Sequence, residues 1–423
     1  MRSVGVLTLG CKVNTYESEY VINELKKAGY EIKSFDDLCD VYIVNTCTVT
    51  NSSDAKSRKM IRQAIHRNPN ACIVAMGCFI AANFDYREKG LDIIIGNKDK
   101  SRIVELLEDY FTNKEMIVDE YKNRLKEFED MYISNFPGRT RAFVKIQDGC
   151  DNFCSYCIIP FVRGKCRSKE EEKVIEEVQS LIENGYKEIV LTGIHTGSYG
   201  TDLDSSFADL LKRLVEIKGL QRLRISSIEA TELNDDVLNV LKNSKVLVDH
   251  LHIPLQAGSN EILKAMNRKY DLTYFFNKIE EIRKIRPNIA ISTDVIVGFP
   301  GETEELFQQT LDTCKRLAFS KTHVFPYSER KGTASSRMNH KIDQSVIKER
   351  SRRLIECSKY LETDYMNSFL DTMVEVLIEE TIDGYSYGHT SNYLHVKIKG
   401  ELPHNEFIKV RIEKVEYPYC IGI

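Results

Sequence analysis

Short apolar runs alternate with amphipathic stretches over the first 110 residues of the chain. The runs are VGVLTLG, VYIVNT, CIVAMG and LDIIIGN, and helical periodicity marks residues 16–28, 53–66 and 99–110. Alternation of this kind is typical of a parallel sheet whose strands are connected by helices. We therefore predict an α/β domain built from parallel βα units over residues 1–115.

A second series of strands and helices begins near residue 141. Its strand candidates are AFVKIQ, EIVLTG, LRIS, LHIPL, ISTDVIVG and THVFPY, and helices are predicted at 170–184 and 271–285. About six βα units make an open or partial parallel (β/α)6 barrel, in which functional groups gather where strand carboxyl ends meet the following loops. We place this barrel at 136–370, and we interpret 116–135, which holds a charged stretch, as a linker.

The end of the chain has a different pattern. MVEVLIEE, YLHVKIKG and FIKVRIEKVEY are rich in β-branched and aromatic residues, and turns with Gly, Asn and Pro separate them. This pattern predicts a small antiparallel β-barrel over residues 371–423.

The composition agrees with a globular protein of two or three domains, since the 423 residues are 42% hydrophobic and 29% charged, with a net charge of −4. No apolar run reaches the roughly 18–20 residues of a membrane span, and we interpret the first run as a strand and not a signal peptide. Twelve cysteines without a secretory signal indicate a reducing compartment. We expect a cytoplasmic protein without a membrane partner.

Three cysteines follow three predicted strands of the first domain. Cys11, Cys47 and Cys78 come directly after VGVLTLG, VYIVNT and CIVAMG. Because the carboxyl ends of parallel strands share one edge of a sheet, where ligand sites form, we expect these thiols to converge. The alternative is that each is a small hydrophobe near a strand end. Six cysteines are interpreted as structural: Cys39, Cys72, Cys166, Cys314, Cys357 and Cys420.

A second group of three cysteines is local. Cys150, Cys154 and Cys157 stand in GCDNFCSYC with the spacing C-x3-C-x2-C, directly after a predicted strand. Thiolates this close on a loop can hold one face of an iron–sulfur cluster and leave one iron open for a small molecule. A structural zinc site is the alternative, and it needs Cys166 as a fourth ligand.

This motif after the first strand of a partial barrel resembles the radical S-adenosylmethionine superfamily. The longer string GCDNFCSYCIIPFVRG, with TLGCKVNTYESE, VNTCTVTNSSDAKSR and AMGC upstream, is similar to the methylthiotransferases along nearly the whole chain. The terminal β module matches the position and size of that family's TRAM domain, an RNA-binding barrel. The resemblance implies a tRNA-modifying transferase with two 4Fe–4S clusters and S-adenosylmethionine as cofactors.

The resemblance also implies roles for individual residues. The dispersed cysteines would hold an auxiliary cluster, and the local group would hold the cluster that cleaves S-adenosylmethionine to a radical; no further catalytic residue is expected. A second S-adenosylmethionine would methylate the sulfur. The later strand ends would contact the methionine, ribose and adenine groups of S-adenosylmethionine. The residues concerned are Gly193, Gly197, Ser226, Ser227, Glu229, His252, Gln256, Asp294, Gly298, Phe299 and Pro300.

Basic residues cluster in two segments that suit contacts with RNA phosphates, although a solvated helix face is the alternative for the second. They are Arg139, Arg141, Lys145, Arg163, Lys165, Arg167 and Lys169, and then Arg330, Lys331, Arg337, Lys341, Lys348, Arg350, Arg352 and Arg353. The terminal module has nine acidic and five basic residues, so it can bind RNA with one face only. Candidates on that face are Lys397, Lys399, Lys409, Arg411, Tyr385, Tyr387 and Tyr393.

The sequence around the first two cysteines, GCKVNTYESE and NTCTVTNSSDAKSR, most resembles the branch that methylthiolates C2 of N6-threonylcarbamoyladenosine in tRNA, 3′ of the anticodon. A second branch acts on N6-isopentenyladenosine, and a third on an aspartate of a ribosomal protein. The implied partners are the tRNA anticodon stem-loop, an electron donor such as flavodoxin or ferredoxin, and a sulfur donor. The competing hypothesis without catalysis is a zinc-stapled RNA-binding adaptor.

Overall fold

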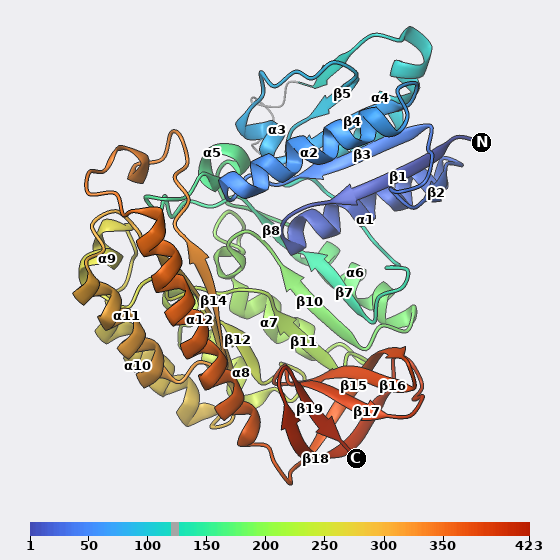
Figure 1. Ribbon diagram of the computed structural model, residues 1–423. Coiled ribbons are helices and arrows are strands. Elements are labelled where there is room, and N and C mark those ends of the chain that lie inside the picture. Colours follow the sequence, from blue (N-terminus) through green and yellow to red (C-terminus); the bar gives the residue numbers. More distant parts are fainter. Residues whose placement is uncertain (120–126) are drawn as a thin grey trace.

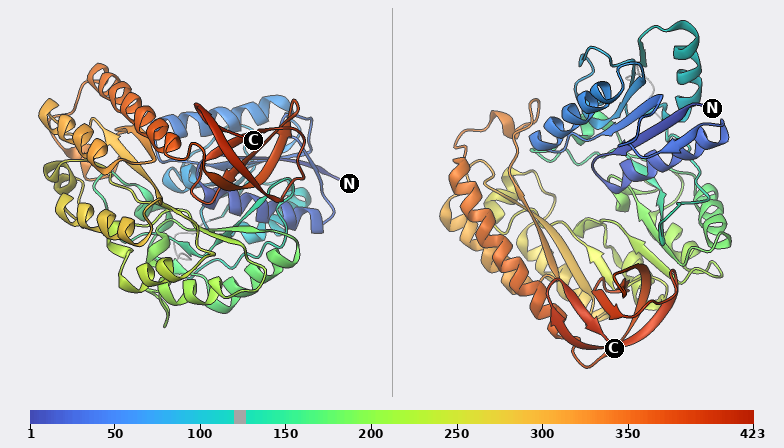
Figure 2. Two further views of the ribbon diagram at one scale, coloured as in Figure 1. Left: turned by 90° about the horizontal axis from the view of Figure 1, so that it is seen from below. Right: turned by 45° about the vertical axis from the view of Figure 1, so that its right-hand side comes forward.

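The chain folds into three parts that follow one another along the sequence. The computed structural model describes residues 1–119 and 127–423. An N-terminal α/β sheet and a C-terminal β-barrel pack against opposite ends of a central half-open barrel (Figures 1 and 2). None of the helices within the described residues combines the length and the apolar character that a membrane crossing requires.

The N-terminal part is a six-stranded parallel sheet with the order β2-β1-β3-β4-β5-β6. Every residue of β3 and β4 is buried, as expected for central parallel strands that helices cover on both faces. Helices α1 and α4 cover one face, and α2 and α3 cover the other. The bounds are β1 (Ser3–Thr8), α1 (Lys12–Lys27), β2 (Glu31–Lys33), β3 (Val41–Thr46), α2 (Asn51–Arg67), β4 (Cys72–Gly77), α3 (Cys78–Ala82), β5 (Ile93–Ile95), η1 (Lys100–Arg102), α4 (Ile103–Asn113) and β6 (Ile117–Asp119).

Strand β6 lies in the segment that the sequence pattern assigns to a linker. It pairs with β5 in parallel and so forms the edge of the N-terminal sheet. Residues 120–126 of the same segment lie outside the described residues.

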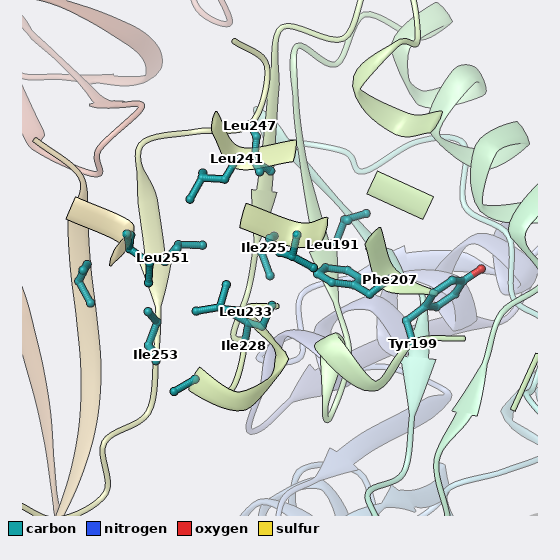
Figure 3. Close-up of a cluster of buried hydrophobic side chains, with 14 of the residues drawn as sticks. Leu191, Tyr199, Phe207, Ile225, Ile228, Leu233, Leu241, Leu247, Leu251 and Ile253 are labelled. Carbon is teal, nitrogen blue, oxygen red and sulfur yellow. The ribbon is translucent and has the colours of Figure 1, made fainter. Parts of the chain in front are cut away.

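The central part contains the six predicted strands in two parallel sheets of three, with the orders β11-β10-β7 and β12-β13-β14. Helices pack outside the strands, and the side chains between the layers form the largest apolar core of the described chain. Figure 3 shows part of it, where Leu191 and Ile225 of one sheet face Leu251 of the other. This is the expected partial barrel.

The bounds of the central elements are as follows. The strands are β7 (Arg141–Lys145), β8 (Gln147–Asp148), β9 (Arg167–Ser168), β10 (Glu188–Thr192), β11 (Arg222–Ile225), β12 (His250–His252), β13 (Ala290–Val297) and β14 (Lys321–Pro326). The helices are α5 (Ile159–Arg163), α6 (Glu171–Glu183), η2 (Thr196–Ser198), α7 (Phe207–Val215), η3 (Ala230–Glu232), α8 (Asp235–Asn243), α9 (Asn260–Ala265), α10 (Leu272–Ile285), α11 (Glu304–Leu317), η4 (Ser335–Arg337) and α12 (Gln344–Asn367).

The C-terminal part is a closed five-stranded barrel with the order β15-β16-β17-β19-β18. Its pairs are antiparallel, as predicted, except that β17 and β19 run parallel. Alternate residues such as Val376, Val396 and Ile412 fill the interior. The strands are β15 (Met373–Ile382), β16 (Tyr385–Thr390), β17 (His395–Lys399), β18 (Phe407–Glu416) and β19 (Tyr419–Gly422).

Candidate active site

The three dispersed cysteines lie after three neighbouring strands of the N-terminal sheet. Cys47 and Cys78 directly follow β3 and β4, and Cys11 ends the short loop after β1. Gly10 brings the first loop close to the second, since its φ is 103° and an added Cβ would lie 3.0 Å from Cys47 Sγ. Desolvation by the surrounding protein raises the pKa of Cys11 and of Cys47, and the neighbouring Cys78 thiol adds to both shifts. The structure thus brings these cysteines together, and we call them the first triad.

Cys150, Cys154 and Cys157 lie on the loop between β8 and α5, and we call them the second triad. The loop turns tightly at its end, where Cys157 N donates to Cys154 O at 2.9 Å. It also needs glycine at position 149, because an added Cβ would lie 1.9 Å from the carbonyl oxygen of Lys165. Burial, with smaller contributions from the other two thiols, raises the pKa of Cys157 to about 12.

The spacing of the cysteines does not match a mononuclear zinc site. Zn–S bonds of about 2.3 Å place the sulfurs of a tetrahedral site about 4 Å apart. Within the described part of the chain, the only three potential ligand atoms that lie within 4.8 Å of one another belong to His252, Asp294 and His323. Each triad offers three thiols, and cysteine thiolates are the usual ligands of 4Fe–4S clusters.

Buried donors contact the sulfurs of both triads. Arg163 Nε donates to Cys78 Sγ at 3.2 Å, and Arg268 Nη1 donates to Cys154 Sγ at 3.2 Å. Hydrogen bonds to sulfur are one of the features that set cluster potentials, so this donor set fits iron–sulfur groups bound at both places. The sequence pattern assigned Arg163 to RNA phosphates and not to a cysteine, and it did not single out Arg268.

His195 is a further neighbour of the second triad that the sequence pattern did not single out. Burial opposes its protonation, but hydrogen bonds to Cys150 and to Glu232 outweigh burial and raise the pKa of His195 to about 11. Its Nε2 lies 2.6 Å from Glu232 Oε1. The His195 ring therefore lies between a predicted cluster ligand and a carboxylate.

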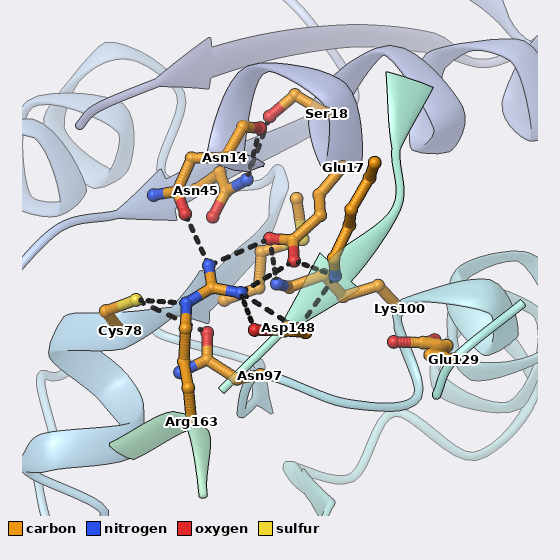
Figure 4. A network of polar contacts seen from close by, with 12 residues as sticks. Asn14, Glu17, Ser18, Asn45, Cys78, Asn97, Lys100, Glu129, Asp148 and Arg163 are labelled. Atoms are coloured by element: carbon orange, nitrogen blue, oxygen red, sulfur yellow. Dashed lines mark hydrogen bonds and ion pairs between the residues drawn. The ribbon is translucent and has the colours of Figure 1, made fainter. Parts of the chain in front are cut away.

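A buried ionic network joins the first triad to β8 and α5, which flank the second triad in the chain (Figure 4). Arg163 follows the second triad in sequence, yet its fully buried guanidinium contacts the N-terminal part. Nη1 lies 3.0 Å from both Glu17 and Asp148, and Nη2 donates to Asn14 at 2.8 Å. Lys145 lies 2.8 Å from the same two carboxylates. Burial alone would raise the pKa of Glu17 and of Asp148, but Arg163 and Lys145, with other cations, hold both pKa values well below their usual range.

The predicted S-adenosylmethionine contacts lie in three different surroundings. Ser226 and His252 line a central cavity, and Asp294 lies 3.3 Å from His252. Glu229 forms an ion pair with Arg268, beside the second triad. Ser227 is partly buried in the loop that follows β11, and Gln256 donates from its backbone N to Asp294 O at 2.8 Å.

The predicted glycines pack against the protein itself. An added Cβ at Gly193 would lie 2.9 Å from Gln147, and one at Gly197 would lie 2.2 Å from Glu232. At Gly298, where φ is 80°, the nearest atom belongs to Ile347 of α12, at 2.3 Å. The small residue is therefore required at each of these positions by neighbouring side chains.

Phe299 and Pro300 lie in the interior. Phe299 is fully buried in the central core, where its ring packs edge-to-face on Tyr327 at a centroid distance of 5.5 Å. Pro300 is also buried. Both positions stabilise the turn after β13.

The prediction of phosphate contacts is wrong for several basic residues, because they are buried in ion pairs. In the first segment these are Lys145, Arg163, Arg167 and Lys169, and in the second they are Arg330 and Arg350. Arg139, Lys165, Lys331 and Lys348 are exposed. Tyr393 also differs from the expected outer face, because its hydroxyl accepts from Arg141 at 2.8 Å, between the terminal barrel and the central part.

Comparison with known proteins agrees with this geometry. Residues 144–314 match the Radical SAM superfamily, and residues 3–96 match a family described as uncharacterized protein family UPF0004. The solved structure of the radical S-adenosylmethionine methyltransferase TsrM from Kitasatospora setae has a TM-score of 0.58 and 14% identity, over 77% of this chain and 75% of that one. The fold and the site thus define an enzyme of the radical S-adenosylmethionine class.

Curated relatives narrow the class. The threonylcarbamoyladenosine tRNA methylthiotransferase MtaB of Bacillus subtilis is 44% identical, over 100% of this chain and 96% of the relative. The MtaB protein of Thermotoga maritima is 38% identical, over 98% of this chain and 95% of the relative. A tRNA-2-methylthio-N(6)-dimethylallyladenosine synthase of Thermoanaerobacter sp. is 36% identical over 88% and 81%. The chain belongs to the radical S-adenosylmethionine methylthiotransferase family, as its motifs predicted. It is a transferase whose cofactors are 4Fe–4S iron–sulfur groups and S-adenosylmethionine.

Proposed function

We propose that this enzyme methylthiolates C2 of N6-threonylcarbamoyladenosine next to the anticodon of tRNA, with two 4Fe–4S clusters and two molecules of S-adenosylmethionine. The observation that carries the proposal is the presence of two cysteine triads, each with a buried arginine on one sulfur. The substrate is supported by relatives of that printed name, which match the chain at higher identity and over more of its length than the dimethylallyladenosine synthase does.

The reaction replaces a C2–H bond by C2–S–CH3, so it needs a methyl group on sulfur and the removal of a ring hydrogen. When bound, the iron–sulfur groups supply electrons and an open iron, and the protein supplies placement. Arg163 and Arg268 orient one sulfur of each triad and compensate its charge. The second triad would hold the S-adenosylmethionine that is cleaved, with Ser226, Ser227 and Glu229 toward its ribose.

The other assignments are proposed on the same basis. Residues 1–115 would carry the auxiliary cluster, 116–135 would connect, 136–370 would form the radical core and 371–423 would be a TRAM domain that binds RNA. The partners would be the tRNA anticodon stem-loop, a flavodoxin- or ferredoxin-like electron donor and a sulfur donor. The location would be cytoplasmic, where cysteines stay reduced.

Mass spectrometry of tRNA nucleosides tests the substrate. A strain that lacks its own methylthiotransferases would be complemented with this chain, with Cys150→Ala and with Cys39→Ala, a cysteine outside both triads. We expect the 2-methylthio form of N6-threonylcarbamoyladenosine with the intact chain and with Cys39→Ala, and none with Cys150→Ala. The 2-methylthio form of the isopentenyl nucleoside alone would assign the chain to the other substrate.

A further inference from the structure

A cavity of about 370 Å³ lies where the three parts of the chain meet. Its walls include Lys12 at the start of α1, Arg224 and His250 from the central strands, and Tyr393 from the terminal barrel. Lys12 directly follows Cys11 of the first triad. The cavity also includes Ser226, which lies after β11 at the carboxyl end of the central sheet. It therefore reaches from the residue after Cys11 to the carboxyl end of β11 inside the half-open barrel.

Cations outnumber carboxylates on the walls of this cavity, but Arg224 is already paired with the buried Glu188 at 2.9 Å. Lys12 has no carboxylate within 4.0 Å among the residues that the structure describes. Glu362, on the same wall, is already paired with Lys321 at 3.1 Å. Burial, and after it the positive charge of Arg224 with a further contribution from Lys12, lowers the pKa of His250 well below its usual range. Because Arg224 and Lys321 have carboxylate partners, Lys12 is the wall cation that is left for an anionic ligand to pair with among the described residues.

The cavity is connected to the outside of the terminal barrel by a series of rings. His250 lies 4.8 Å from Tyr393, which lies 5.1 Å from His389. His389 stacks on His395 at 4.5 Å, and Tyr419 lies 4.6 Å beyond. His389, Tyr393 and His395 are partly buried and line the cavity itself, so these rings continue its wall into the terminal barrel.

We propose that this cavity receives the modified adenosine and that Lys12 binds the carboxylate of its threonylcarbamoyl group. The inference rests on the proposed function and names the residue that selects between its two candidate substrates. The threonylcarbamoyl substituent carries an anion, whereas an isopentenyl group is apolar. An apolar group enclosed beside Lys12 would desolvate an ammonium and give it no partner, which is unfavourable. Lys12 therefore selects for the charged nucleoside and against the apolar one.

Binding of three anticodon stem-loop RNAs tests this role without relying on turnover. The RNAs are identical except at the base 3′ of the anticodon, which is N6-threonylcarbamoyladenosine, N6-isopentenyladenosine or adenosine. Fluorescence anisotropy would give Kd values for the reconstituted full chain without reductant. For each variant the ratio of two Kd values is compared, because a ratio does not depend on the fraction of loaded protein. We expect wild type and Lys12→Arg to prefer the threonylcarbamoyl RNA over the adenosine RNA.

Lys12→Met should lose about tenfold of that preference and should gain affinity for the isopentenyl RNA relative to adenosine. Lys26→Met, which removes an exposed lysine at the other end of α1, should keep both ratios of the wild type. If Lys12→Met keeps the preference while wild type methylthiolates the threonylcarbamoyl nucleoside, the role of Lys12 is refuted and the proposed function stands. If wild type neither prefers nor methylthiolates that nucleoside, both are refuted.

Discussion

Replacing Arg163 tests whether one buried network holds the first triad against β8 and α5, which flank the second triad. The Arg163→Met variant keeps most of the side-chain volume and removes the charge and all donors. Six polar atoms lose a partner: Cys78 Sγ at 3.2 Å, Asn14 Oδ1 at 2.8 Å, both carboxylate oxygens of Glu17 at 3.0 and 3.3 Å, and both of Asp148 at 3.0 and 3.1 Å. Breaking a buried ion pair from one side costs about 3–5 kcal/mol.

The lower end of that range is expected here, because Lys145 stays 2.8 Å from both carboxylates and Lys100 still pairs with Glu17. With a urea dependence of about 3 kcal/mol per molar, a loss of about 3 kcal/mol moves the first unfolding transition by about 1 M. Circular dichroism of the cluster-free full chain would measure it. The matched control Lys165→Met, on an exposed side chain two residues away, should shift the free energy of unfolding by less than about 0.5 kcal/mol.

A second readout follows the sulfur contact directly. Arg163→Lys keeps a positive charge on a shorter side chain, so it should be more stable than Arg163→Met. It should still shift the reduction potential of the first cluster from the wild-type value, which electron paramagnetic resonance during a redox titration would measure. If Arg163→Met unfolds at the wild-type urea concentration and its reconstituted first cluster has the wild-type reduction potential, Arg163 does not have this role.

Three further predictions follow from the same contacts. Folding lowers the pKa of Glu17 and of Asp148, so their contribution to stability should be complete above about pH 5 and should be lost as the pH falls toward their folded pKa values. The urea midpoint of unfolding should therefore drop more steeply with falling pH in wild type than in a Glu17→Gln variant. An equal pH dependence of the two midpoints would contradict this. Arg330→Met should lower the free energy of unfolding by about 2–3 kcal/mol, since it breaks a buried ion pair with Asp54 at 2.8 Å. Amide hydrogen exchange in α2, which carries Asp54, should then become faster, while exchange in the terminal barrel should stay unchanged. Arg268→Met should lower cleavage of S-adenosylmethionine to 5′-deoxyadenosine by about tenfold or more, because Arg268 contacts both Cys154 Sγ and Glu229, a predicted ribose partner. Cleavage at the wild-type rate would show that this arginine is dispensable.

Much of the fold could be predicted because its strands are apolar and its helices periodic. The long buried strands β3, β4 and β13 appear as clear runs in the sequence. Strands β2 and β6 do not, because three residues are too few to show a pattern and neither strand is fully buried. The six barrel strands and the terminal barrel are confirmed, while the parallel pair β17–β19 depends on closure of the barrel and leaves no local signal.

The candidate site was predictable as far as its residues follow strands. Cys47 and Cys78 could be placed at one sheet edge because each directly follows a buried run. Arg163 could not be assigned to the first triad, since its partner Cys78 lies 85 positions earlier. For the same reason a count of basic residues misled the phosphate prediction. Lys145 lies near other cations in the sequence, but in space it pairs with Glu17, 128 positions away.

The most direct test of the central claim is the metal content of the anaerobically reconstituted protein. Two open 4Fe–4S sites predict about eight irons in wild type. Removing either the first triad (Cys11, Cys47 and Cys78 to Ala) or the second (Cys150, Cys154 and Cys157 to Ala) should leave about four irons in each case. About four irons in wild type that survive loss of the first triad, or bound zinc in place of iron, would contradict the account of two separate cluster sites.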